Sequence, residues 1–360
     1  MELCRICNSA NSDFFKEGEC WICEGKALLT DKMLDAAEKI LKQENPKTFC
    51  ISTKIPKDWL AREEKAWDVK LGESIKNRLN RMVKGRLSGL ARHQSDGDVR
   101  IVFDYSDGKV SLVRNDIFIF GRYLKHKAGL SQSRWRCRKC LGKGCNECDG
   151  KGKYYESVEE RIGEPLKELS GSEDYVLHAS GREDVDATNS AGRIFVLMLK
   201  SPKTREIDLG NAARMIAESG EVSVTDLKFV KRGFVEVVTE SHFDKTYSAE
   251  AEFGRELDSG DIDKIQSLAG KMLAQRTPKR VSHRRADLVR KRRVKEIMVK
   301  SHEGNRATIS IKAEAGTYIK ELISGDEGRT EPSIADLLGT AAKCTALDVS
   351  EIDDGFMELF

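Results

Sequence analysis

Four Cys-x-x-Cys pairs constrain the fold of this 360-residue chain more than any other feature of its sequence. Twelve residues separate the first two pairs, and the other two form a tandem repeat of the pattern Cys-x-x-Cys-x-Gly-x-Gly. Each pair can present two thiolates from one tight turn, as small zinc modules do. The eight cysteines are Cys4, Cys7, Cys20, Cys23, Cys137, Cys140, Cys145 and Cys148. They predict structural zinc, because four thiolates around one ion leave no open coordination position.

Two structural zinc ions are expected, one for each group of four cysteines. The spacing does not decide whether pairs from different groups share an ion. A redox-active dithiol is the alternative for any single pair, but neither group follows the strand-then-helix pattern of a thioredoxin unit. Cys50 and Cys344 stand apart and are expected to be ordinary buried thiols.

A short basic segment, residues 276–295, dominates the distribution of charge. It contains ten Lys or Arg residues and one acid, Asp287, whereas the whole chain has a formal net charge of only +3. A dense cationic segment on an acidic body suggests a polyanionic partner, most simply nucleic acid. The alternative is a basic helix face that is exposed to solvent and has no partner.

The composition limits the class of protein. Hydrophobic residues make up 39% of the chain and charged residues 34%, which excludes a disordered or collagen-like chain. The apolar stretch 194–199 is far too short to span a bilayer, and the N-terminus lacks the pattern of a signal peptide. We therefore expect a soluble, cytoplasmic protein of about two to three domains with no membrane partner. The sequence leaves the oligomeric state open.

The pattern of apolar residues divides the chain into four segments. Residues 1–45 are expected to form a zinc knuckle and a helix, and residues 46–130 a mixed α/β module. Residues 131–153 contain the cysteine repeat and are expected to form a stiff hinge. In residues 154–360, strands and helices alternate in mixed order. This pattern predicts an α+β domain on a mixed, largely antiparallel sheet.

Individual elements are predicted from apolar periodicity. The stretch 194–199 is apolar throughout, as expected of a strand buried on both faces. The stripe Ile262, Ile265, Leu268 and Met272 indicates a helix. Other helices are expected at 30–41 and 332–338, and strands at 49–53, 100–105, 110–113, 117–125, 175–179, 245–253 and 306–315.

Several kinds of chemistry lack their sequence signatures. No Walker A loop, His-Glu-x-x-His helix or Rossmann glycine motif is present. We therefore expect no nucleotide or other organic cofactor. The remaining candidate is Asp184 in a Gly-Arg-Glu-Asp loop, although these four residues alone could be a charged surface turn. Two further segments, 245–247 and 316–322, combine aromatic and basic side chains.

In this order, the three segments resemble the motifs of RNA pseudouridine synthases. Residues 179–186, 277–287 and 318–330 are similar to one family in particular, the archaeal and eukaryotic tRNA pseudouridine synthase family ten, which modifies uridines of the T loop. The N-terminal cysteine pairs and residues 120–125 resemble that family's zinc-bearing THUMP domain. The resemblance implies a THUMP-like RNA-binding domain within 46–130, a pseudouridine synthase domain at 154–360, and tRNA as the partner.

The resemblance also implies roles for individual residues. Asp184 would be the catalytic carboxylate that acts at C1′ of the target ribose, and Lys320 the basic residue that pairs with it. Tyr247 would stack on the extruded base, and Tyr318 would be the second tyrosine of the uridine pocket. The other expected substrate-binding residues are Ile319 and Leu347 as apolar pocket walls and, from the basic segment, Arg290, Arg292 and Arg293 as phosphate contacts.

Two alternatives are weighed against this interpretation. A non-catalytic, zinc-dependent adaptor for structured RNA would have no reason to combine Asp184, Tyr247 and Lys320. A THUMP-coupled methyltransferase or thiolation enzyme would need a glycine signature that is missing. The chain departs from the family at residues 188–195, which are slightly shorter and lack a proline, so the path of an RNA-contacting loop is open. The choice between nucleophilic attack and elimination, and between one T-loop uridine and two, is also open.

Overall fold

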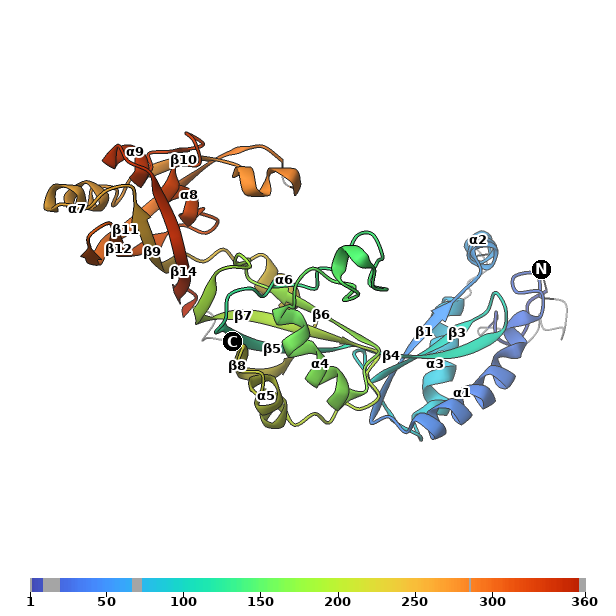
Figure 1. Ribbon diagram of the computed structural model, residues 1–360. Coiled ribbons are helices and arrows are strands. Elements are labelled where there is room, and N and C mark those ends of the chain that lie inside the picture. The colour runs from blue at the N-terminus through green and yellow to red at the C-terminus, as the bar shows by residue number, and fades with distance from the viewer. Residues whose placement is uncertain (1, 9–19, 67–72, 285, 356–360) are drawn as a thin grey trace. The chain divides into compact units, whose positions relative to one another are not determined.

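A computed structural model describes residues 2–8, 20–66, 73–284 and 286–355 of the chain (Figure 1). The chain divides into two compact units. The first consists of Met1–Asp116 with Lys200–Arg205, and the second of Ile117–Leu199 with Glu206–Phe360. Within the part of the chain that the structure describes, no helix is both long and apolar enough to cross a membrane.

The first unit is built on a four-stranded sheet of order β2-β1-β3-β4. Strand β1 runs parallel to β2 and to β3, and β3 and β4 form an antiparallel hairpin. The strands are β1 (Thr48–Lys54), β2 (Arg92–His93), β3 (Val99–Asp104) and β4 (Lys109–Arg114). The helices are α1 (Thr30–Glu44), α2 (Lys57–Lys65) and α3 (Ile75–Leu87).

The core of this unit combines helix faces, strands and cysteines. Helix α1 buries Met33, Leu34, Ala37 and Leu41, the periodic residues that predicted it, and it ends three residues later than expected. The four N-terminal cysteines belong to the same buried cluster as Phe49 and Trp59. The folding of this unit is therefore tied to the state of these thiols.

The second unit contains a ten-stranded sheet of order β13-β10-β11-β12-β9-β14-β7-β5-β8, with β6 paired to β7. Strand β14 runs parallel to β7, and the other pairings along this path are antiparallel. The strands are β5 (Ile117–Lys125), β6 (Asp174–Ala179), β7 (Thr188–Lys200), β8 (Val222–Val230), β9 (Lys245–Phe253), β10 (Met272–Arg276), β11 (Val289–Glu303), β12 (Arg306–Ala313), β13 (Thr330–Glu331) and β14 (Ala342–Ile352). The predicted α+β class with a mixed, largely antiparallel sheet is confirmed.

The helices of the second unit lie over two parts of this sheet (Figure 1). Helices α4 (Val158–Ser170) and α5 (Leu209–Ala217) pack beside β6 and β8, whereas α7 (Ser259–Gln266), α8 (Ile319–Ser324) and α9 (Ile334–Leu338) pack near β11 and β14. A short helix, α6 (Phe234–Thr239), precedes β9. Along β7, Phe195 and Leu197 enter one core cluster and Ile194 and Val196 another, so the strand is buried on both faces, as predicted.

Three features differ from the sequence-based expectations. Strand β5, which the division into segments placed within 46–130, pairs with β7 and β8 in the second unit. Met272 begins β10 instead of continuing a helix, because α7 ends at Gln266 and Gly270, with φ of 74°, turns the chain. Residues 188–195, where the chain departs from the family and the path of an RNA-contacting loop was left open, are the first part of β7, which therefore begins six residues before the predicted strand 194–199.

Candidate active site

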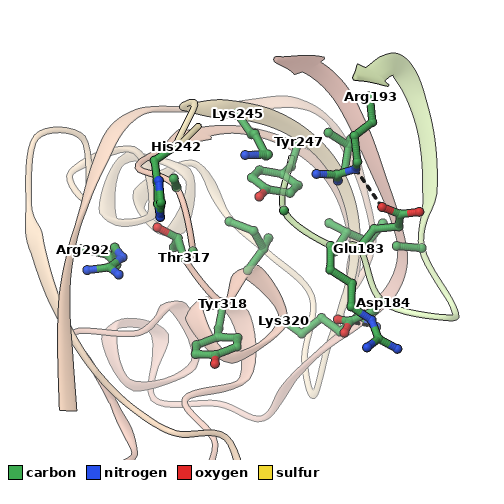
Figure 2. Close-up of a pocket in the computed structure, with 18 of the residues that line it drawn as sticks. Glu183, Asp184, Arg193, His242, Lys245, Tyr247, Arg292, Thr317, Tyr318 and Lys320 are labelled. Atoms are coloured by element: carbon green, nitrogen blue, oxygen red, sulfur yellow. Dashed lines mark ion pairs between the residues drawn. The ribbon is translucent and has the colours of Figure 1, made fainter. Parts of the chain in front are cut away.

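A pocket of about 540 Å³ lies in the second unit, lined by the loop after β6, by β7, β9, β11 and β14, and by the start of α8 (Figure 2). Arg293 does not line it, because its Nη1 donates to Gly270 O at 3.3 Å on the exposed side of β11. The other eight predicted catalytic or substrate-binding residues line it together: Asp184, Tyr247, Arg290, Arg292, Tyr318, Ile319, Lys320 and Leu347. Segments far apart in the sequence therefore meet at one cavity.

Asp184 lies in the loop between β6 and β7, with its carboxylate between two cations. Arg280 Nη1 donates to Asp184 Oδ1 at 2.8 Å. Lys320 Nζ lies 3.6 Å from Asp184 Oδ2 and closer, at 2.5 Å, to Asp186 Oδ1. The side chain of Asp184 is 32% exposed, so a substrate can reach it. The expected neighbour Lys320 is present, but Arg280 makes the shorter contact.

Arg280 is fixed from its other side by α8. Its Nε donates to Glu321 Oε1 at 2.6 Å, and Glu321 is buried. Burial alone would lower the pKa of Arg280, but the hydrogen bond to Glu321 and the charge of Asp184 raise it overall. Arg280 therefore remains a cation beside Asp184 at every physiological pH.

Two tyrosines lie on opposite elements of the pocket (Figure 2). Tyr247 is on β9, is 9% exposed, and has a pKa raised to about 12 by burial, so its phenol is neutral. Tyr318 precedes α8, and the buried side chain of Gln275 binds both its N–H and its C=O, each at 2.9 Å. Leu347 is on β14, opposite Ala249 of β9. The pocket thus presents aromatic and apolar surfaces near a carboxylate.

A buried ion pair lies directly behind the catalytic candidate. Glu183 and Arg193 have side chains that are 1% and 2% exposed, and Arg193 Nε lies 2.8 Å from Glu183 Oε2. The hydroxyl of Tyr123 donates to the Glu183 carboxylate at 2.8 Å. Breaking a pair as buried as this leaves an uncompensated charge, which costs about 3–5 kcal/mol. The pair therefore fixes the residue next to Asp184.

Lys245 adds a further buried cation to the pocket wall. It is 7% exposed, and its Nζ donates to Phe243 O at 2.8 Å. Burial, followed by the positive charge of Arg193, lowers its pKa to about 8.

The basic segment forms the end of β10, a 3-10 turn at Lys279–Arg284 and the start of β11, and not a basic helix. Some of its charges are already paired, since Arg276 contacts Asp287 at 2.6 Å, and Arg329, from outside the segment, contacts the same carboxylate at 2.6 Å. Arg292 differs, because it lines the pocket and contacts no carboxylate among the described residues. This guanidinium can therefore bind an anion that enters the pocket.

Eight of the cysteines form two separate clusters, and each cluster combines two Cys-x-x-Cys pairs that are neighbours in the sequence. In each cluster, all four Sγ atoms lie within 4.8 Å of one another. The first cluster contains Cys4, Cys7, Cys20 and Cys23, and the second contains Cys137, Cys140, Cys145 and Cys148. Pairs from different groups do not share a site.

The backbone around the second cluster suits bound thiolates. Gly144 N donates to Cys140 Sγ at 3.2 Å, and Gly152 N to Cys148 Sγ at 3.1 Å. Four thiolates with amide hydrogen bonds fit a tetrahedral divalent ion that is closed to substrate. The second cluster is therefore a candidate metal centre with a structural and not a catalytic donor set.

Comparison with known proteins shows which family has this sequence pattern. Residues 118–353 match a family model described as "Pus10, C-terminal". The chain belongs to the Pus10 family. Proteins named "tRNA pseudouridine synthase Pus10" from Methanothrix thermoacetophila and Korarchaeum cryptofilum are 37% and 36% identical to it. Each alignment covers 96% of this chain, and 80% and 96% of the respective relatives. A relative of the same name from Methanothermobacter marburgensis is 41% identical over 94% of this chain and 87% of its own length.

The Pus10 match begins one residue into β5, next to the boundary of the second unit at residue 117. It contains the pocket, the basic segment and the second cysteine cluster, whereas the first cluster lies outside it. Among solved structures, a Cbf5-Nop10-Gar1 complex aligns with 51% of this chain and 41% of the matched chain at 20% identity, with a TM-score of 0.32. The family resemblance drawn from the sequence motifs is confirmed.

Within this Pus10-family pocket, sequence reasoning missed Arg280, Arg193, Glu183 and Lys245. Three of them lie inside the motifs themselves: Glu183 precedes Asp184, Arg280 is in 277–287, and Lys245 opens the segment with Tyr247. The signal for Arg193 is a single charge directly before the apolar run 194–199. Such a charge needs a buried partner, which is Glu183.

Proposed function

We propose that this protein is a tRNA pseudouridine synthase, and that Asp184 is its catalytic residue. The observation that carries the proposal is the joint placement of Asp184, Tyr247 and Lys320 on one pocket. Membership of the Pus10 family, whose relatives bear that activity in their names, supports it. We propose uridines of the T loop as the substrate and the cytoplasm as the location.

The reaction is an isomerisation, so its atoms balance without a co-reactant. The bond between N1 of uracil and C1′ breaks, the base rotates, and a bond between C5 and C1′ forms. The proton lost from C5 is matched by the one gained at N1. Asp184 would act at C1′, and the cations of Arg280 and Lys320 would keep its carboxylate in place and balance its charge.

The aromatic walls would compensate for extruding the base from the stack. Unstacking costs a few kcal/mol, and stacking on an aromatic side chain returns about 1–3 kcal/mol per base. Tyr247 would provide that face, and Tyr318, Ile319 and Leu347 would close the pocket. Because the Tyr247 phenol is neutral, it would add no charge beside the substrate.

The basic segment would bind the phosphates that precede or follow the target nucleotide. Arg292 and Arg290 line the pocket, whereas Arg293 lies outside it and would reach a phosphate further along the strand. Contacts of this kind provide affinity without reading sequence.

We further propose that each cysteine cluster binds one Zn²⁺ ion. The donor sets are four thiolates in both clusters, which favours Zn²⁺ over the harder divalent ions. Each ion would fix its module structurally, since neither cluster lines the pocket. Metal analysis of protein purified without chelator should find two Zn²⁺ per chain.

Incubation of purified protein with unmodified tRNA, followed by chemical mapping of pseudouridine, tests the function. No cofactor is added. We expect conversion at T-loop uridines and none in a tRNA whose T-loop uridines are replaced by cytidines. Tight tRNA binding without any pseudouridine would favour the rival adaptor and would contradict the proposal.

A further inference from the structure

The loop that carries Asp184, residues 180–185, lies outside the helices and strands. Its carbonyl groups are bound by three buried side chains. Arg193 Nη1 donates to Ser180 O at 2.7 Å, and Gln132 Nε2 donates to Gly181 O at 2.9 Å. Lys125 Nζ donates to Asp184 O at 3.1 Å and to Val185 O at 2.9 Å. The position of the carboxylate is therefore set by side chains from outside the loop.

Lys125 makes two of its three hydrogen bonds to this loop. Its third hydrogen bond goes to Leu130 O at 2.7 Å, so all three ammonium donors are used by backbone carbonyls. The residue is only 1% exposed. A buried cation is costly unless its hydrogen bonds are made, so any displacement of these carbonyls is penalised.

Gln132 connects the loop to the ion pair behind it. Besides Gly181 O, its amide donates to the hydroxyl of Tyr123 at 2.9 Å, and that hydroxyl donates to Glu183. Gln132 is 8% exposed and does not line the pocket. One amide thus contacts the loop at Gly181 and, through Tyr123, at Glu183.

Gln132 also lies in the stem of the second cysteine module. The module is the cysteine repeat at 137–152, and its stem consists of residues 131–136 and 153–159, which contact each other on either side of the repeat. Its carbonyl accepts from Glu159 N at 3.0 Å, and the neighbouring Ser131 pairs with Ser157. The two sides of the stem meet again at an isolated bridge between Arg136 and Lys153, which flank the cysteine repeat, and Cys137 N donates to Gly152 O at 2.8 Å. Backbone hydrogen bonds therefore close the stem beside the cysteine cluster, and at the other end of the stem the side chain of Gln132 binds the loop that carries Asp184.

We propose that the second cysteine module is a clamp on the catalytic loop. With its four thiolates gathered on one metal ion, the module closes the stem, and the stem places Gln132 against Gly181. Gln132 and Lys125 are positioning residues, since they act on Asp184 through its backbone. The inference rests on the proposed role of Asp184, and it gives the 137–152 repeat a role in catalysis without contact with substrate.

Two single variants and their combination test the clamp. Gln132→Met keeps the size of the side chain but removes both donors, and it leaves the cysteines intact. Cys140→Ser removes one ligand from the second cluster. Gln43→Met, at an exposed glutamine of α1 in the first unit, is the matched control. Four quantities are measured: metal content, the Kd for tRNA, the single-turnover rate at saturating tRNA, and hydrogen exchange of the 180–185 amides.

Gln132→Met should keep its full metal content and bind tRNA with a Kd within about twofold of the wild type, because phosphate contacts dominate affinity. Its single-turnover rate should fall about tenfold to a hundredfold, because a small misplacement of a reacting group has an effect of that size. Hydrogen exchange of the 180–185 amides should accelerate.

Cys140→Ser should lose one metal ion and show the same slower turnover, faster exchange and nearly unchanged Kd. The single-turnover rate of the double variant should be little lower than that of the slower single variant, because both substitutions act through one connection.

Several results would overturn the clamp. One is a wild-type rate for Gln132→Met. Another is a Cys140→Ser protein that binds tRNA weakly but reacts normally at saturation, which would make the module an RNA contact. A third is a double variant whose loss equals the product of the single losses. Wild-type protein that forms no pseudouridine would instead contradict the proposed function, and the exchange measurement would still decide whether the module orders the loop.

Discussion

At the scale of single residues, the carboxylate of Asp184 has a closer cation than the motifs predict. Lys320 follows Tyr318 in a recognisable motif, so its role can be inferred from sequence. Arg280 contacts Asp184 across 96 residues of chain. No local pattern encodes a contact over that separation, since it depends on how the 3-10 turn at Lys279–Arg284 is placed by β10 and β11. The motifs indicated Lys320 as a neighbour of Asp184, whereas the contact of Asp184 with Arg280, which itself lies within 277–287, follows only from the fold.

Asp184→Asn separates chemistry from binding. The substitution keeps the size of the side chain but removes its charge and the carboxylate that would act at C1′, so pseudouridine formation should fall by several orders of magnitude. The Kd for tRNA should stay within about threefold, because affinity comes mainly from phosphate contacts. Asp186→Asn is the matched control: it removes a neighbouring acid that pairs with Lys320 but does not line the pocket. Near-normal turnover in Asp184→Asn would contradict its assignment as the catalytic residue.

Lys245 gives the folded protein a measurable pH dependence. Its pKa is about 8 in the fold and 10.5 as the ordinary value, so between these values the unfolded chain binds more protons than the folded one. The free energy of unfolding contributed by this residue should therefore rise with pH in that window, by at most about 1.4 kcal/mol per pH unit. Urea unfolding of the wild type and of Lys245→Met, measured from pH 7 to 10, isolates the residue. Parallel curves for the two proteins would show that Lys245 is not desolvated.

At the scale of elements, strands were predictable where alternation marks one buried face. Strands β5 and β9 have the predicted limits, and β7 was recognised from its apolar run. The partners of a strand were not predictable in the same way. Strand β5 follows the β3–β4 hairpin closely in sequence, yet its hydrogen bonds go to β7 and β8. Alternation reports which face of a strand is buried, and says nothing of which edge it joins.

The glycines of the cysteine repeat offer a test at this scale. Gly152 has φ of 71°, and a Cβ placed on it would lie 2.4 Å from Gly142 O. Gly150 has φ of 75°, but a Cβ there would meet nothing within 4 Å. Both alanine variants carry the strain of a positive φ, of about 1–3 kcal/mol, but only Gly152→Ala also forces the backbone of the module apart. Gly152→Ala should therefore lose metal from the second cluster to a chelator much faster than Gly150→Ala. Equal rates of loss would show that strain at φ alone limits the module.

At the scale of the whole molecule, charge is concentrated and not spread. The chain has a net charge of +3, yet residues 276–295 contain ten Lys or Arg residues and one acid. In the structure those of them that are described lie on β10, on β11 and in the 3-10 turn at Lys279–Arg284, beside the pocket. Such an arrangement gives a local attraction for a polyanion in a protein that is close to neutral. The segment was recognisable from sequence, whereas its strand conformation and its place beside Asp184 were not.

The dependence of tRNA affinity on salt distinguishes this local attraction from net charge. Replacing Arg290, Arg292 and Arg293 together with alanine should weaken binding between about 50 and 200 mM salt. It should also reduce the slope of log K against log salt by about 0.7–0.9 for each phosphate that is no longer neutralised. The control replaces Arg214, Lys264 and Lys300, three exposed cations elsewhere in the second unit, and changes the net charge by the same amount. Because the Debye length is about 8–10 Å at these salt concentrations, charges distant from the RNA are screened, and the control should keep the wild-type slope. Equal slopes for the two triple variants would mean that tRNA senses only the overall charge, and that Arg290, Arg292 and Arg293 face solvent in the complex.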